Sequence, residues 1–247
     1  MTDPSPLGGA GWGAPDPELR DAVAALLDAV GDGVLPIVQA GDPVLRTPAA
    51  PYTGQLGDVL PRLVEVMRRT MHAAPGVGLA APQVGIGLAV AVVEDRGAPD
   101  DPRERTALPF RVLVNPDYAP AAGPDGVDGA DGGRAAFFEG CLSVHGWQAV
   151  VARHRRVRLT GQDAAGAPVD EVLTGWPARI VQHETDHLRG ELYLDHAETR
   201  SLTSNDNLVR YWSASPDPRP AADALGFPLG RPDPAQVNHG PGGPRPR

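Results

Sequence analysis

The residues most able to do chemistry lie in one short segment, QHETDH at 182–187. On a helix, His183 and His187 fall one turn apart on the same face, so their two imidazoles can bind a single metal ion. Glu184 lies between them and can then reach a water molecule on that ion. The competing interpretation is that the pattern arose by chance and that both histidines are ordinary helix-surface residues.

Two histidines are not a complete site, because catalytic metal sites usually have three protein ligands and one open position. Metalloproteases with this motif take the third ligand downstream, where His196 and Glu198 are candidates. The upstream candidate is Cys141, the single cysteine of the chain. A thiolate suits Zn²⁺ and Fe²⁺, but a free cysteine more often serves as a small buried apolar side chain. Residue types alone leave both directions open.

Three segments together resemble the signature motifs of the peptide deformylase family, in the family's order. GVGLAAPQ at 76–83 is similar to GxGLAAxQ, EGCLS at 139–143 matches EGCLS, and QHETDH at 182–187 is similar to QHExDH. The similarity covers residues 35–196. Three linked motifs are far more specific than HExxH alone.

The resemblance implies that Cys141 is the third ligand, so that Cys141, His183 and His187 hold one divalent ion. It implies Fe²⁺ as the natural metal, and Zn²⁺, Ni²⁺ or Co²⁺ can use the same ligands. The implied reaction removes formate from the N-terminal formyl-methionine of newly made polypeptides. The alternatives are a zincin-like metalloprotease, another amidohydrolase, and a relative that binds peptide without turnover.

The resemblance also implies roles for three further groups. A divalent ion lowers the pKa of a coordinated water from about 15.7 toward 7. Glu184 is expected to take the proton of this water and to give it to the leaving amine. In the family, the side-chain amide at the position of Gln83 and the backbone N–H at that of Leu142 stabilise the oxyanion. Losing one such donor typically lowers the rate about 100- to 1,000-fold.

The substrate is expected to meet bare backbone on one side and apolar side chains on the other. Glycines form turns, and they also let a peptide approach and pair with the main chain as an added strand. The methionine pocket should be apolar, although Trp176 is equally compatible with a place in the core. The residues expected to bind substrate are Gly76, Val77, Gly78, Gly140, Trp176 and Ile180, with His183 at the pocket.

Four further polar residues, Glu139, Arg153, Asp186 and His145, lie in or near the motifs. In the family, Glu139 tends to form an ion pair near the site, and Arg153 is a candidate partner. Asp186 is expected to orient a ligand histidine or to bond locally, and the alternative is a solvated helix residue. His145 departs from the family, in which Pro is frequent at this position, so the loop shape and peptide contacts there are not carried over.

The fold must bring these segments together. Apolar residues at helical spacing predict helices at 17–30, 56–73 and 176–189. Apolar runs bounded by turn residues predict strands at 88–93, 110–115, 147–160 and 167–173. Because the strands are mostly sequential and joined by turns, we expect an α+β fold. Its antiparallel β-sheets should pack around the central HExxH helix, with an additional N-terminal helix.

Composition divides the chain into three parts. Gly, Pro and Ala dominate residues 1–16, which predicts a disordered arm. Residues 17–212 form the expected catalytic domain, interrupted by a Gly/Asp/Pro-rich loop at 119–133. Residues 213–247 are so rich in Pro and Gly that we expect a disordered tail.

Charge and hydropathy limit the partners. The formal net charge of −9 does not favour binding to nucleic acid or an anionic membrane. The sequence has neither a membrane-spanning apolar stretch nor a signal-peptide pattern, and its one cysteine cannot form an internal disulfide. We expect a cytoplasmic monomer that acts on N-formyl-methionyl nascent peptides. Some family members dock on the ribosome through a basic C-terminal helix, a pattern missing from this tail, so we expect at most a transient ribosome contact.

Overall fold

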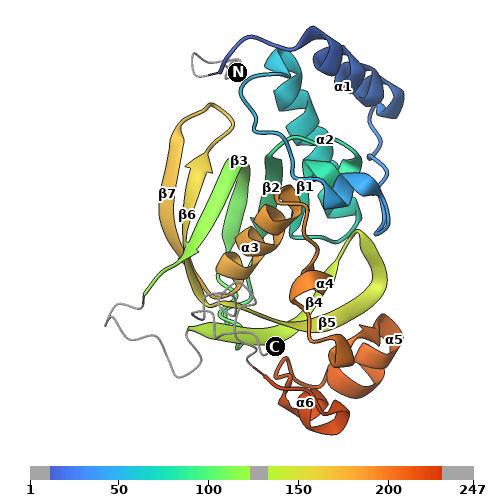
Figure 1. The fold of residues 1–247 in the computed structure, drawn as a ribbon, viewed down its shortest axis with the longest axis vertical. Helices are drawn as coiled ribbons and strands as arrows, with labels where there is room; N and C mark the ends of the chain where they lie inside the picture. Colours follow the sequence, from blue (N-terminus) through green and yellow to red (C-terminus); the bar gives the residue numbers. More distant parts are fainter. Residues whose placement is uncertain (1–11, 123–132, 230–247) are drawn as a thin grey trace, which may run out of the picture.

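The computed structural model describes residues 12–122 and 133–229. Two antiparallel sheets surround one central helix, α3 (Trp176–Leu188), which carries both histidines of the third motif (Figure 1). The helix starts after Gly175 and accepts Pro177 in its first turn, where a backbone N–H has no helical partner. It is buried on nearly all sides, as expected for a helix enclosed by other elements. The predicted α+β fold is confirmed.

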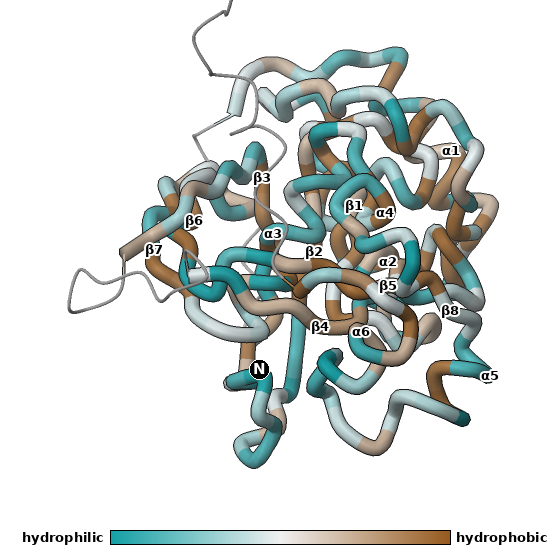
Figure 2. Tube along the Cα trace, turned by 60° about the horizontal axis from the view of Figure 1, so that its bottom comes forward, coloured by the Kyte–Doolittle hydropathy of each residue, from teal (hydrophilic) through white to brown (hydrophobic). Residues whose placement is uncertain are grey.

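The larger sheet has five strands in the order β1-β2-β3-β6-β7, and every neighbouring pair is antiparallel. Its strands are β1 (Gly78–Ala80), β2 (Val90–Asp95), β3 (Leu108–Pro120), β6 (Arg156–Gln162) and β7 (Pro168–Thr174). Alternate side chains of β2 enter different cores. Val90 and Val92 join the core beside α2 (Leu60–Ala73), whereas Ala91 and Val93 join the core around α3. Because β2 is buried on both faces, its sequence is a continuous apolar run at residues 88–93 (Figure 2).

The smaller sheet has three strands in the order β4-β5-β8. Its strands are β4 (Arg134–Cys141), β5 (Val144–His154) and β8 (Thr203–Ser204). A tight hairpin joins β4 to β5, with Cys141 opposite Val144. Cys141 therefore stands at the end of β4, next to the turn. The sequence did not predict β4, whose residues RAAFFEGC lack strict alternation of apolar and polar types.

Two helices come from the N-terminal third: α2 packs against β1 and β2 of the larger sheet, and α1 (Pro17–Val30) packs on α2 (Figure 1). Helix α1 coincides with the prediction, and the side chain of Asp16 caps it by accepting from the N–H groups of Glu18 and Leu19. The predicted helix 56–73 is α2 preceded by one 3₁₀ turn. The remaining helical segments are η1 (Pro43–Arg46), η2 (Gly57–Val59), η3 (Ala81–Val84), α4 (Tyr193–His196), η4 (Thr199–Ser201), α5 (Asn205–Asn207), η5 (Leu208–Trp212) and α6 (Arg219–Leu225).

The structure differs from the expected disordered arm and tail where it describes them. Trp12 packs its ring edge-on against Tyr52, 4.9 Å between centroids, and its Nε1 donates to the carbonyl of Ala164. At the other end, α6 and Phe227 pack against β5, which buries Ala221, Ala222 and Phe227 around Val150. Composition alone misses such segments because they join a core that other elements build. Residues 1–11 and 230–247 lie outside the described part.

The strand predicted at 110–115 is also longer than expected. The sequence predicts an end at Asn115, directly before Pro116, but β3 continues to Pro120. The register shifts between Val114 and Asp117, and Asn115 has a φ of 48°, which makes a local bulge that accommodates the proline. Most of the predicted loop 119–133 lies outside the described residues.

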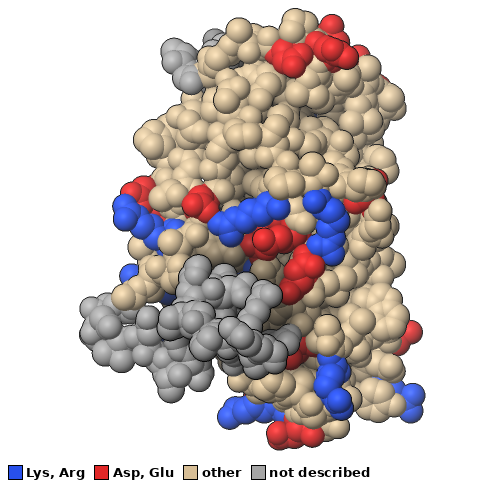
Figure 3. Space-filling view, in the orientation of Figure 1, with Lys and Arg blue, Asp and Glu red and all other residues tan. Residues whose placement is uncertain are grey.

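Charged side chains on the surface are largely paired. On the face in Figure 3, Arg side chains alternate with Asp and Glu rather than forming a patch of one sign. Arg219 bonds Asp217 at 2.6 Å, and Arg158 bonds Asp170 at 2.5 Å. No helix in the described parts of the chain is long and apolar enough to cross a bilayer.

Candidate active site

Cys141, His183 and His187 lie together. Their ligand atoms are all within 4.8 Å of one another, and Cys141 Sγ is 3.2 Å from His187 Nε2. The two histidines come from successive turns of α3, and the cysteine comes from the end of β4. The downstream candidates lie elsewhere: His196 Nε2 bonds Glu191 at 2.8 Å, and Glu198 follows α4. The fold therefore brings the upstream candidate, rather than His196 or Glu198, beside the histidines.

The chemistry of these three groups fits a divalent metal ion. One thiol and two imidazoles form a donor set suited to Zn²⁺ or Fe²⁺. His183 has its Nδ1 2.7 Å from Glu139 Oε1, so Nδ1–H donates to the carboxylate and Nε2 is left to bind an ion. Among the described residues, the buried Nδ1 of His187 has no hydrogen-bond partner.

Glu184 is buried against the backbone of β1. Only 4% of it is exposed, and burial raises its pKa to about 7. Its Oε2 has no hydrogen-bond partner among the described residues, so this oxygen is free to handle a proton. A Cβ built on Gly78 would lie 2.1 Å from Glu184 Oε1, so only glycine fits at this position.

We expect Gly78→Ala to lower kcat by about 100-fold, because a displacement of about 1 Å in a catalytic group has an effect of this size. Glu184 is itself enclosed and cannot move aside without losing its position. Steady-state kinetics with a metal assay would measure the change. Gly87→Ala is the matched control, since nothing lies within 4 Å of a Cβ built there. Equal kcat values for the two variants would contradict the expectation.

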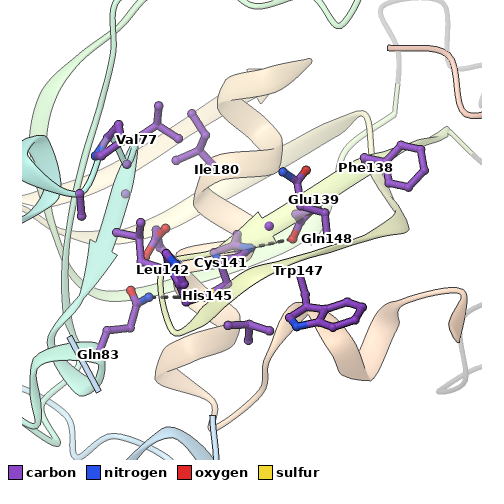
Figure 4. Close-up of a pocket in the computed structure, with 18 of the residues that line it drawn as sticks. Val77, Gln83, Phe138, Glu139, Cys141, Leu142, His145, Trp147, Gln148 and Ile180 are labelled. Carbon is purple, nitrogen blue, oxygen red and sulfur yellow. Dashed lines mark hydrogen bonds and ion pairs between the residues drawn. The ribbon is translucent and has the colours of Figure 1, made fainter. Parts of the chain in front are cut away.

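Gln83 points its amide nitrogen toward Cys141. Its Oε1 accepts from the N–H of Ala80 at 2.8 Å, which fixes the amide. Its Nε2 lies 3.5 Å from Cys141 Sγ and 3.3 Å from Ser143 Oγ. Leu142 follows the cysteine and lines the same pocket (Figure 4).

A pocket of roughly 770 Å³ opens beside the three potential ligands, between the two sheets. Every residue expected to bind substrate lines it: Gly76, Val77, Gly78, Gly140, Trp176 and Ile180. β1 and β4 are edge strands of their respective sheets, so each presents unpaired backbone groups. The pocket also extends past residues that the sequence did not suggest: Arg103, Trp147, Gln148 and Asn205.

Behind the histidines lies a buried network of charges. The guanidinium of Arg153 donates to both oxygens of Glu139 and, at 2.5 Å, to Asp186. Burial alone would raise the pKa of Glu139, but Arg153 and His183 outweigh burial and hold that pKa well below its usual range. Asp186 also accepts from the hydroxyl of Tyr118 at 2.9 Å. Asp186 is buried and bonds Arg153 and Tyr118, so the expectation of a solvated helix residue is wrong, and neither of these partners is a ligand histidine.

An α+β fold with a thiol, two imidazoles and a buried carboxylate at one pocket has the side chains that a metal-dependent hydrolase uses. Comparison with known proteins gives the family. A model of the polypeptide deformylase family matches residues 34–202. Peptide deformylase 1 of Streptomyces coelicolor is 62% identical over 216 residues, which cover 85% of this chain and 94% of that protein. Peptide deformylase 1 of Bifidobacterium longum is 50% identical over 218 residues, covering 87% and 96%.

Solved structures of peptide deformylases resemble this chain as well. A peptide deformylase from Synechococcus elongatus in complex with actinonin is 32% identical, covers 79% of this chain and 87% of that one, and has a TM-score of 0.55. The Met-Ala-Ser-bound class I type b enzyme from Acinetobacter baumannii is 34% identical, covers 66% and 98%, and has a TM-score of 0.57. The chain belongs to the polypeptide deformylase family. It is a hydrolase that removes the N-formyl group from nascent peptides, and the family to which it belongs is metal-dependent.

Proposed function

We propose that Cys141, His183 and His187 hold one divalent ion, Fe²⁺ in the cell, which Zn²⁺, Ni²⁺ or Co²⁺ can replace. The observation that supports this most directly is the gathering of these three donors beside the buried Glu184. When bound, the ion supplies a Lewis acid for the formyl oxygen and polarises the attacking water. The family resemblance favours Fe²⁺, since the donor set alone suits several of these metals.

Glu184 moves the proton. Its carboxylate accepts a proton from the attacking water and returns it to the nitrogen of the leaving amine. Water thus adds across the formyl C–N bond, and the products are formate and a free N-terminal methionine. As charge develops on the formyl oxygen, Gln83 Nε2 and the backbone N–H of Leu142 donate hydrogen bonds to it. The tie between Gln83 and Ala80 supports this role, because it orients the amide before substrate arrives.

The peptide lies between the edges of β1 and β4. Backbone at Gly76, Val77 and Gly78 pairs with it on one side, and Gly140 leaves room on the other. A Cβ on Gly140 would lie 3.0 Å from Gln148 Cγ, so a side chain at this position would displace Gln148, which also lines the pocket. The methionine side chain occupies the apolar part of the pocket at Trp176 and Ile180.

A formate-release assay on a formyl-Met tripeptide tests the proposal. The metal-loaded protein should release formate, and chelation should abolish the release. A matched N-acetyl peptide reports general amidohydrolase activity, and mass spectrometry of the products reports internal cleavage by a metalloprotease. Cleavage of either of these kinds without formate release would refute the proposal.

We further propose that the enzyme works as a cytoplasmic monomer, with at most a transient ribosome contact, because its substrates are nascent chains.

A further inference from the structure

Arg179 lies one turn before His183 on α3, at the back of the site. Only 4% of it is exposed, although its position in a helix gives no reason to expect burial. Its NH1 donates to Glu139 Oε2 at 2.7 Å, and its NH2 donates to the carbonyl of Ala135 at 2.5 Å. NH1 also lies 3.2 Å from the carbonyl of Val151. The guanidinium is thus bonded to both strands of the β4–β5 hairpin and to Glu139.

Glu139 is held by two side chains of α3 that are one turn apart. His183 Nδ1 bonds Oε1 at 2.7 Å, and Arg179 NH1 bonds Oε2 at 2.7 Å. Arg153 donates to both oxygens, but its NH1 is committed to Asp186. Without Arg179, only the shared Nε of Arg153 would bond Oε2, at 3.0 Å, and the carboxylate could rotate away from His183.

The same guanidinium also contacts two aromatic rings, and one of them, Trp176, lines the pocket. Its carbon atom lies 5.2 Å from the ring centroid of Phe137 and 5.6 Å from that of Trp176. Arg103 also stacks on Trp176, at 4.4 Å, but its acidic partner is Asp101 rather than Glu139. Arg179 therefore contacts both the carboxylate behind His183 and the indole of Trp176.

We propose that Arg179 is a positioning residue for metal binding, acting through Glu139 on His183. It fixes the plane of the carboxylate, and the carboxylate fixes the ring and tautomer of the histidine. Partners of this kind typically change metal affinity about 10- to 100-fold when they are removed. This inference rests on the proposed metal ligands Cys141, His183 and His187.

The test measures metal loss rather than activity. Arg179→Met should accelerate dissociation of bound Co²⁺ or Zn²⁺ into excess chelator about 10- to 100-fold. Arg103→Met is the matched control, because it removes a guanidinium from the same indole without touching Glu139. Its dissociation rate should stay within about twofold of wild type, whereas KM can change in both variants. Equal rates for Arg179→Met and wild type would overturn the proposal.

A double-mutant cycle tests the route through Glu139. In a Glu139→Gln background, adding Arg179→Met should change the dissociation rate by less than about twofold, since coupled residues do not add. If the two substitutions instead multiplied each other's effect on the dissociation rate, Arg179 would act independently of Glu139, and the proposal would be overturned. Should Arg179→Met fail to fold, Arg179→Lys replaces it. A lysine cannot bond Glu139 and two carbonyls together, so metal loss should still accelerate by about tenfold, and an unchanged rate would count against the proposal.

These experiments distinguish failure of the positioning role from failure of the proposed metal site. A wild-type protein that binds no metal would refute the proposed function itself. A wild-type protein that binds one ion and loses it on Cys141→Ala, but keeps it normally in the Arg179 variants, would refute only the positioning role.

Discussion

Replacing Glu184 by Gln is expected to lower kcat for deformylation by about 10²- to 10⁴-fold, the usual contribution of a general acid–base group. The amide keeps the shape of the side chain but cannot accept the proton of the attacking water. Because the carboxylate is buried and its pKa is raised to about 7, a neutral replacement should not destabilise the fold. Stopped-time formate assays at saturating peptide would measure kcat.

Metal content decides how a loss of activity in this variant is interpreted. Glu184 is not among the three clustered ligands, so the ion should stay at the wild-type level. Glu191→Gln is a suitable control, because this carboxylate bonds His196 instead of facing the pocket. A Glu184→Gln enzyme with full metal and kcat within tenfold of wild type would show that another group transfers the proton.

Replacing Cys141 by Ala should remove the metal. The thiolate is the only one of the three donors that comes from a sheet, and no other cysteine can substitute for it. We expect the affinity to fall by more than the roughly 10- to 100-fold typical of residues behind a ligand. Activity should fall to that of the chelated enzyme. Atomic emission after gel filtration gives the metal content, and circular dichroism gives the fold.

His196→Ala and Glu198→Ala test the opposite assignment. A zincin-like site would take its third ligand from one of these positions and would keep its metal without Cys141. We expect both variants to retain the ion, because His196 bonds Glu191 and lies outside the cluster. Retention in Cys141→Ala together with loss in either downstream variant would reverse the assignment.

The helix with both histidines was predictable because its signal is local. Spacing of four residues puts His183 and His187 on one face, and neighbouring apolar residues give the helix its buried side. The position of Cys141 was not predictable in this way. It depends on the β4–β5 hairpin meeting α3, a contact over more than 40 residues, which only the family resemblance could supply.

Arg179 shows another limit of sequence analysis. An arginine in a helix usually extends into solvent, and no local pattern marks this one as buried. Its burial depends on Glu139, which β4 brings behind the helix and which requires positive partners. The one available signal was its spacing, since Arg179 precedes His183 by one turn on a helix expected to be central.

The two edge strands that border the pocket, β1 and β4, also bear on aggregation. Unpaired strand edges are templates for association with other chains, and proteins usually shorten or cover them. Here β1 has only three residues, and both edges face into the pocket. A sheet edge of another folded protein has no access to such a recess, whereas a single extended chain end does. The geometry that admits a nascent N-terminus thereby keeps these two strand edges from pairing with another sheet.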